Sequence, residues 1–156
     1  MHRKTKHPQC AFLNFFGELA LVDEGIHELL YLLKMQGVRT QFSCQGDYDH
    51  GAYVLIKTKT LWGLLWRICK SWLAGNYTKE SKQLIRRFRK GYKEARITWY
   101  HGTSDPNVSI ANGKDAYYCV EPTYTNGDGF RITFRWPPED TETLCNMLLQ
   151  TEPRRK

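Results

Sequence analysis

Residues 37–58 read GVRTQFSCQGDYDHGAYVLIKT and organise the rest of the chain. Two runs rich in β-branched and aromatic residues, Val38–Cys44 and Ala52–Thr58, flank a loop over Gln45–Gly51 that contains two glycines, two aspartates and a histidine. Runs of this composition on either side of a polar, glycine-containing loop are typical of a β-hairpin. Loops held by a rigid pair of strands often carry binding residues. We therefore predict an antiparallel hairpin whose loop is a candidate binding site.

Before the hairpin, apolar residues recur at the i, i+3, i+4, i+7 spacing, which predicts an amphipathic helix over residues 24–36. Asp23 is expected to cap its first turn, and Gly37 is expected to end it in a conformation with positive φ. Residues 11–16 and 18–22 are apolar, so we expect them to supply a short strand or a packed lead-in to this helix.

Two helices are expected after the hairpin. Thr60 is expected to cap the first, which runs from residue 61 to about residue 74 and is apolar on nearly all sides. Such a helix is buried by its own domain or by a partner subunit. It contains Trp62, Trp66 and Trp72. We interpret it first as a bulky core helix; the alternative is an interface, where tryptophan is enriched.

The second of these helices is predicted to run from Lys79 to about Lys90, with Thr78 as its cap and Gly91 as its end. Its outer face is cationic, and a clustered cationic excess favours polyanionic partners such as nucleic acid or nucleotides. The alternative is a solvated face that aids solubility. The residues expected to contact phosphate are Lys82, Arg86, Arg87, Arg89 and Lys90.

The C-terminal half is predicted to form strands. Residues 95–101 alternate between apolar and polar side chains, as a half-buried strand does. Residues 116–124 and 130–136 are joined by the turn sequence Thr125–Gly129, which is a strong hairpin signal.

Pro137 and Pro138 end the predicted sheet, and a last helix opens at Asp140 or Thr141. The predicted order is therefore α-β-β-α-α-β-β-β-α. This order predicts a single α+β domain with an antiparallel sheet of about five strands and helices packed on one face. The expected divisions are a flexible basic arm over residues 1–10, the domain over 11–151 and a basic tail over 152–156.

The 156-residue chain is 41% hydrophobic and 13% aromatic, which fits a globular protein and argues against disorder. Its net charge is +7. The five cysteines are odd in number and form no CxxC pair, and no signal peptide is present, so a reducing cytoplasm is the expected compartment. The longest apolar stretch, Leu61–Leu73, is shorter than the roughly 20 residues that span a bilayer. No membrane partner is expected.

The end of the first predicted hairpin strand and the start of the loop offer a hydroxyl, a thiol, an amide and a flexible backbone from consecutive residues. Gly46 can adopt positive φ or bring backbone N–H groups close to an anion. We interpret the segment as a ligand-binding loop; the alternative is a hairpin turn whose Ser and Asp side chains bond their own backbone. The candidate binding residues are Ser43, Cys44, Gln45, Gly46 and Asp47.

A catalytic Cys44 would need a thiol of lowered pKa and a nearby base, for which His50 and His101 are the candidates. No spacing fixes either histidine beside Cys44, so we assign no catalytic residue. The Cys and His spacings match no zinc pattern, and the Walker A, GxSxG and HExxH motifs are absent. No metal site and no cofactor are predicted.

A third candidate site combines arginines from the predicted strands. Alternation places Arg131 and Arg135 on the polar face of one strand, and Arg96, Thr98 and Tyr100 on the polar face of another. If these faces coincide, they form a phosphate-binding surface with an aromatic ring beside it. The alternative is the ordinary solvent-facing side of a half-exposed sheet.

Residues 23–56 contain D-E-G-I-H-E-L-L, then G-V-R-T-Q-F-S-C-Q-G-D, then A-Y-V-L-I. This succession resembles a group of small uncharacterised phage and bacterial proteins, whose shared pattern is a helix, then G-(I/V)-x-T-x-(F/Y)-S-C-(Q/E)-G, then a strand beginning A-Y. The string I-T-F-R-W at residues 132–136 also resembles the end of those proteins. The resemblance implies a phage or mobile-element origin and, in that setting, sequestration of a host nucleotide signal.

A remoter likeness is to the wybutosine-synthesis methyltransferase-like family of tRNA modification, which carries S-S-C-S-G-R at a comparable turn. Ser43, Cys44 and Gly46 match that motif, whereas Gln45 and Asp47 stand where the family has Ser and Arg. The likeness implies RNA modification, and Asp47 replaces the cation of the motif with an anion.

The leading hypothesis is a small cytoplasmic binding protein for an anionic nucleotide ligand or nucleic acid. Residues 43–47 with Arg131 and Arg135 would form its pocket, and the basic helix would add positive potential. One alternative is an enzyme that uses Cys44 or a loop-bound metal, for example in RNA modification. Another is a protein-interaction module, or a homo-oligomer, formed through the tryptophan-rich helix over residues 61–73.

Overall fold

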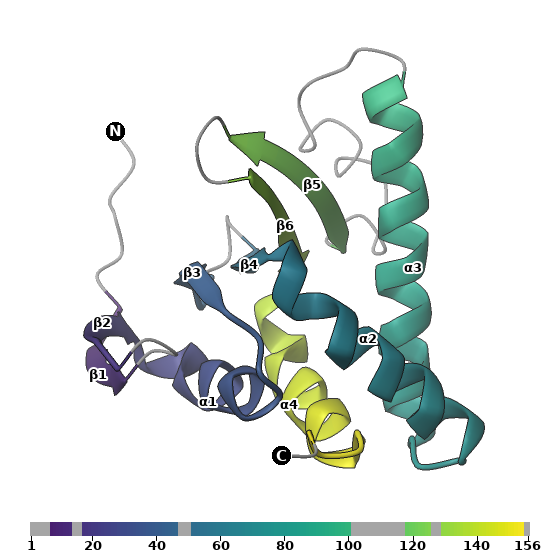
Figure 1. The fold of residues 1–156 in the computed structure, drawn as a ribbon, viewed down its shortest axis with the longest axis horizontal. Helices are drawn as coiled ribbons and strands as arrows, with labels where there is room; N and C mark the ends of the chain where they lie inside the picture. Colours follow the sequence, from purple (N-terminus) through teal and green to yellow (C-terminus); the bar gives the residue numbers. More distant parts are fainter. Residues whose placement is uncertain (1–6, 14–16, 47–50, 101–117, 126–128, 155–156) are drawn as a thin grey trace.

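The computed structural model describes residues 7–13, 17–46, 51–100, 118–125 and 129–154. It confirms an α+β fold in which helices cover one face of an antiparallel sheet (Figure 1). In the described part of the chain this sheet has four strands rather than the predicted five or so.

The main sheet is antiparallel throughout, with the strand order β3-β4-β6-β5. Its strands are β3 (Thr40–Cys44), β4 (Ala52–Lys57), β5 (Cys119–Thr125) and β6 (Gly129–Trp136). Both predicted hairpins, β3–β4 and β5–β6, are confirmed. The two hairpins join at the centre of the sheet, where β4 pairs with β6 and Val54 lies opposite Phe134.

A separate two-stranded sheet precedes the first helix and consists of β1 (Gln9–Leu13) and β2 (Leu19–Asp23). The sequence predicts a short strand or a packed lead-in here, and each of the two apolar runs forms a strand. Gln9 and Cys10, which fall in the predicted N-terminal arm, belong to β1.

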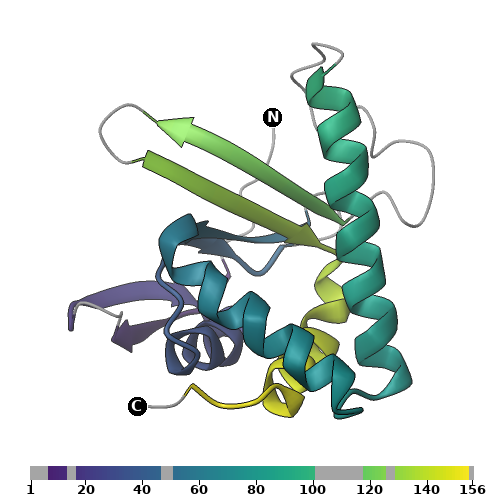
Figure 2. The same ribbon diagram turned by 45° about the vertical axis from the view of Figure 1, so that its right-hand side comes forward.

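The α-helices of the described residues are α1 (His27–Met35), α2 (Thr58–Leu73), α3 (Lys79–Tyr100) and α4 (Thr141–Gln150). Single 3-10 turns, η1 (Glu24–Ile26) and η4 (Pro138–Asp140), lead into α1 and α4. Gly37 follows α1 with a φ of 78°, as predicted. Figures 1 and 2 show α1, α2 and α4 on one side of the sheet and α3 beside β5.

The core lies between these helices and one face of the main sheet. Along β4, Ala52, Val54 and Ile56 are buried, and the residues between them are half-buried. Trp136 at the end of β6 is fully buried, and its indole N–H donates a hydrogen bond of 2.9 Å to Thr141 Oγ1 in α4. The apolar residues on the inward sides of η1, α1 and α4 are buried: Ile26, Leu29, Leu30, Leu33, Leu144, Met147 and Leu148.

The third helix is longer than the sequence predicts. Because α3 continues to Tyr100, the predicted helix end at Gly91 and the predicted strand over residues 95–101 are both wrong. Gly91 marks a close approach instead, since a Cβ atom at this position would overlap the carbonyl oxygen of Tyr118. Beyond it, residues 93–96 are good helix formers and carry the helix onward.

Helix capping agrees with the sequence at one site and differs at two. Thr78 caps α3 as predicted, with its Oγ1 accepting a hydrogen bond of 3.3 Å from the Ser81 N–H. Asp23 does not cap the first helix through its side chain, because its Oδ2 accepts a hydrogen bond from the Gln45 N–H instead. Thr60 lies inside α2, which begins earlier than predicted.

We expect Gly91→Ala to lower the free energy of unfolding by about 1–3 kcal/mol, because the added methyl group overlaps rigid backbone at Tyr118. The matched control is Gly63→Ala in α2, where a Cβ would approach only the flexible Arg67 side chain, at 3.1 Å from Nη1. There the better helix propensity of alanine should raise stability by up to about 1 kcal/mol. Urea titrations followed by circular dichroism would measure both changes. Equal effects of the two substitutions would contradict the close approach of α3 to β5.

Candidate nucleic-acid interface

Gln45 in the predicted binding loop ties three segments together. Its backbone N–H donates to Asp23 Oδ2 at 3.0 Å, and its side-chain Oε1 accepts from the Gly25 N–H at 2.8 Å. Its Nε2 lies 2.9 Å from His7 Nδ1. The hydrogen bonds of Gln45 therefore hold the segment where β2 meets η1 against the end of β3.

The other loop candidates are placed differently from one another. Ser43 pairs with a core-facing residue of β4, whereas Cys44 pairs with a residue on the opposite face. Gly46 has a φ of 76°, as predicted. Asp47, the side chain of Cys44, and the two candidate bases His50 and His101 lie outside the part of the chain that the structure describes.

Arg131 and Arg135 share the outer face of β6 but lie at different ends of its pairing with β4. Arg135 is opposite Tyr53 near the hairpin loop, and its guanidinium carbon lies 5.2 Å from the centroid of the Tyr53 ring. Arg131 is opposite Lys57, about 13 Å further along the strand at about 3.3 Å per residue. The structure thus brings Arg135 to the loop end of the sheet and Arg131 to the far end.

The predicted surface of arginines from two adjacent strands is wrong in its second half. Arg96, Thr98 and Tyr100 belong to α3, so they do not form a strand face beside β6. Both Arg131 and Arg135 are half-buried. The outer face of the sheet therefore offers two separated and partly covered guanidinium groups.

An exposed stripe of aromatic and basic side chains follows α2. Trp62 is 65% exposed and Trp66 is 64% exposed, although Leu61 and Leu64 bury the opposite side of the helix in the core. Lys70 Nζ lies 5.7 Å from the Trp66 ring centroid, within the range of a cation–π interaction. At about 100° per residue, the stripe occupies about 80° of the helix circumference. Its members are Lys59, Trp62, Trp66, Lys70 and Leu73.

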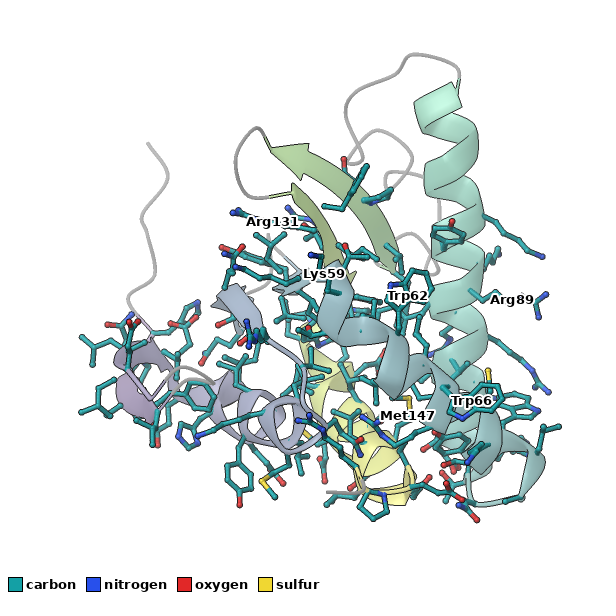
Figure 3. The ribbon with its side chains drawn as sticks, in the orientation of Figure 1. Lys59, Trp62, Trp66, Arg89, Arg131 and Met147 are labelled. Carbon is teal, nitrogen blue, oxygen red and sulfur yellow. The ribbon has the colours of Figure 1, made fainter. Side chains whose placement is uncertain are left out.

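A basic stripe on α3 continues this surface. Lys82, Arg86 and Arg89 recur at the i, i+4, i+7 spacing and so share one side of the helix. Trp72, at the end of α2, has Lys82 Nζ at 5.6 Å and the Arg86 guanidinium at 5.5 Å from its ring centroid, so the basic stripe of α3 contacts α2 on the side of Trp72, about 80° around the helix from Trp62. Figure 3 shows Trp62 and Trp66 along α2 and Arg89 extending from α3. We call Lys59, Trp62, Trp66, Lys70, Trp72, Lys82, Arg86 and Arg89 the α2–α3 surface.

The five cations predicted on this helix are therefore divided between two sides. Arg87 turns away from the α2–α3 surface, because it forms an ion pair of 3.8 Å with Asp140 and lies over the Tyr118 ring. Lys90 is exposed next to the basic stripe. Three of the predicted phosphate contacts, Lys82, Arg86 and Arg89, belong to the surface.

The interpretation of α2 as a core helix is wrong for Trp62 and Trp66, because only one side of the helix can reach the sheet. The i, i+4 spacing of these tryptophans, with Lys59 and Lys70 on the same face, is the signal by which the sequence reveals the stripe. Average hydrophobicity does not reveal the stripe, because α2 also carries apolar residues on its inward side.

Two of the described cysteines are buried, and their thiols are poor nucleophiles. Burial raises the pKa of the Cys119 and Cys145 thiols to about 11. Cys69 is exposed on α2, and Cys10 is half-buried. The described residues contain no group of three or more potential metal ligands. None of the described helices has both the length and the apolar character needed to cross a bilayer.

No protein-family model, no curated protein and no solved structure matches this chain. The geometry of the α2–α3 surface is therefore the basis for assigning a function.

We expect Gln45→Ala to lower the free energy of unfolding by about 0.5–1.5 kcal/mol, because it removes the exposed hydrogen bond between the Gln45 side chain and the Gly25 N–H. The control is Gln83→Ala on the exposed side of α3, for which we expect a change within about 0.5 kcal/mol. Thermal unfolding of both variants would measure the difference. If Gln45→Ala leaves the stability unchanged, this structural role is contradicted and the Gln45 side chain is again a candidate for ligand binding.

We expect alkylation near pH 8 to modify Cys69 rapidly and Cys119 and Cys145 slowly. At that pH a thiol with a pKa of about 11 is ionised in only about one molecule in a thousand, and burial further limits access. Because folding raises both pKa values, stability is also expected to fall between about pH 9 and about pH 11 as the unfolded thiols ionise. Mass-spectrometric mapping of iodoacetamide labels, with a urea-unfolded control, would measure the order. Early modification of Cys119 would contradict the burial of its side chain.

Proposed function

We propose that this protein binds single-stranded nucleic acid across the α2–α3 surface. The observation that carries the proposal is that the exposed Trp62 and Trp66 rings share a stripe of α2 with lysines, next to a half-buried Trp72 ring that two cations of α3 contact. Proteins that bind single strands combine cations that follow the phosphate backbone with aromatic rings on which bases stack. Both components are present here, on α2 and on the side of α3 that contacts it.

The exposure of Trp62 and Trp66 supports a ligand with accessible ring faces. An exposed tryptophan ring gains most from a partner that covers it with another flat, apolar surface, and an unstacked base offers this. The bases of a duplex are stacked inside it, so the rings have no comparable partner there. The arrangement therefore favours single strands over duplex.

The length of the surface supports a polymer over a mononucleotide. From Lys59 to Lys70 the stripe covers about 16 Å of helix axis at about 1.5 Å per residue. The pocket first predicted for a nucleotide has less support, because the Gln45 amide is bonded within the protein and Arg131 lies far from Arg135 along the sheet. The net charge of +7 adds a long-range attraction for any polyanion.

The proposal predicts saturable binding of a fluorescent oligothymidylate of about fifteen nucleotides, measured by anisotropy between about 50 and about 200 mM salt. Trp66→Ala is expected to weaken binding about 5- to 150-fold, the range that corresponds to loss of one base–aromatic stack. Replacing Lys82 or Arg86 by Ala should reduce the slope of log affinity against log salt by about 0.7 per lost phosphate contact. The matched control is Tyr31→Ala, which removes a half-exposed aromatic ring on α1, away from the surface.

Three outcomes would contradict this assignment. Binding that does not depend on salt would exclude the phosphate contacts, and Trp66→Ala without effect would exclude the stacking platform. Release of a bound mononucleotide from the heated protein would instead favour the nucleotide-binding hypothesis drawn from the sequence.

The exposed apolar side chains of α2 also favour a second candidate, a self-association interface. Leu73 is 86% exposed on the same stripe as Trp62 and Trp66. A dimer formed through this stripe would dissociate at low protein concentration and would be disrupted by Leu73→Asp. Sedimentation in the anisotropy buffers separates the two candidates, because a monomer that binds the oligonucleotide supports only the first.

A further inference from the structure

A cavity of about 410 Å³ lies between α2, α3 and the core face of the main sheet. Its walls come from β4, β5, β6 and each of the described α-helices, with Val54, Phe134, Leu64, Phe88 and Met147 among them. Figure 3 labels Trp62, Arg89 and Met147, which line it from α2, α3 and α4. The cavity is thus formed by the same elements that build the hydrophobic core.

This volume is unusual for a protein interior. Cores pack as densely as organic crystals and leave few voids larger than a water molecule. Apolar cavities also do not hold water well, because a buried water needs polar partners. Sites for small molecules, by contrast, typically measure about 300–1,000 Å³ and are mainly apolar.

The cavity reaches the surface between the two helices. Its lining includes Trp62 and Leu65 from α2 and Tyr92 from α3, all of which are exposed, together with the exposed Arg89. Among the described residues that line the cavity, Arg89 alone carries a charge. Arg89 is therefore the one charged residue among the described residues of an otherwise apolar lining, and its side chain is exposed to solvent on α3.

We propose that this cavity binds an amphipathic anion, a small molecule with an apolar body and one carboxylate. The apolar body would fill this space against the core face of the sheet, which is favourable because the body leaves water and gains dispersion contacts with the cavity walls. The carboxylate would remain at the mouth, where water reaches it and where the Arg89 side chain can pair with it. Neither the nucleic-acid proposal nor its test depends on this site.

The probe for this proposal is decanoate, titrated calorimetrically below its micelle concentration. We expect one saturable site per chain and a negative heat-capacity change, the mark of apolar burial. Decanol should bind more weakly, because it has the same chain without the charge. Arg89→Gln should weaken decanoate binding about three- to fivefold and leave decanol unchanged, as expected for a solvent-exposed ion pair.

Arg86→Gln is the matched control, because Arg86 is exposed on the same helix and does not line the cavity. This substitution should leave decanoate binding unchanged while it weakens oligonucleotide binding. Leu64→Phe and Leu144→Phe each place a larger ring in the cavity from a different helix. Both should abolish decanoate binding, raise the melting temperature by filling empty space, and leave oligonucleotide binding intact.

The proposal is overturned if decanoate fails to saturate at one equivalent, or if decanol binds as tightly as decanoate. It is also overturned if Leu64→Phe and Leu144→Phe both lower the melting temperature, since overpacking would show that the space is filled. If the unmodified protein binds decanoate but no oligonucleotide, only the nucleic-acid proposal is contradicted.

Discussion

The burial of Trp136 is the interaction on which the arrangement of the helices depends. Its ring is fully buried at the end of β6, where its N–H bonds to Thr141 at the start of α4. Phe88 of α3 packs edge-on against Trp136 at 6.4 Å and against Phe134 at 5.9 Å between centroids. One strand end therefore holds two helices in place. The remaining helix, α2, meets the core along one side only, which is why its other side carries exposed tryptophans.

The sequence predicted elements whose signals are local. The hairpins β3–β4 and β5–β6 follow from alternation and from their turn residues, and α1 follows from its apolar spacing and from Gly37. The end of α3 was not predictable in this way. Locally, Gly91 indicates the end of a helix and the alternation over residues 95–101 indicates a strand, whereas the helix is continuous through a glycine that is needed for contact with Tyr118. That contact is absent from any local window of sequence.

The candidate site shows the same division between local and distant determinants. The polar cluster around Gln45 suggested a ligand, but its partners Asp23 and Gly25 lie about twenty residues earlier and no spacing rule connects them. The stripe on α2 follows from helical periodicity alone. What the sequence could not tell is which side of α2 faces the core, because both sides carry apolar residues and only the packing of the sheet decides between them.

Trp62 lies in both of the features proposed to bind ligands. Its exposed ring belongs to the α2–α3 surface, and the same side chain lines the mouth of the cavity. A molecule that enters the cavity and changes the orientation of this ring must therefore change the affinity of the surface for a stacked base. Thermodynamic linkage makes the effect reciprocal, so an oligonucleotide would change the affinity of the cavity by the same factor. Occupants that leave the ring where it is would produce no coupling, however tightly they bind.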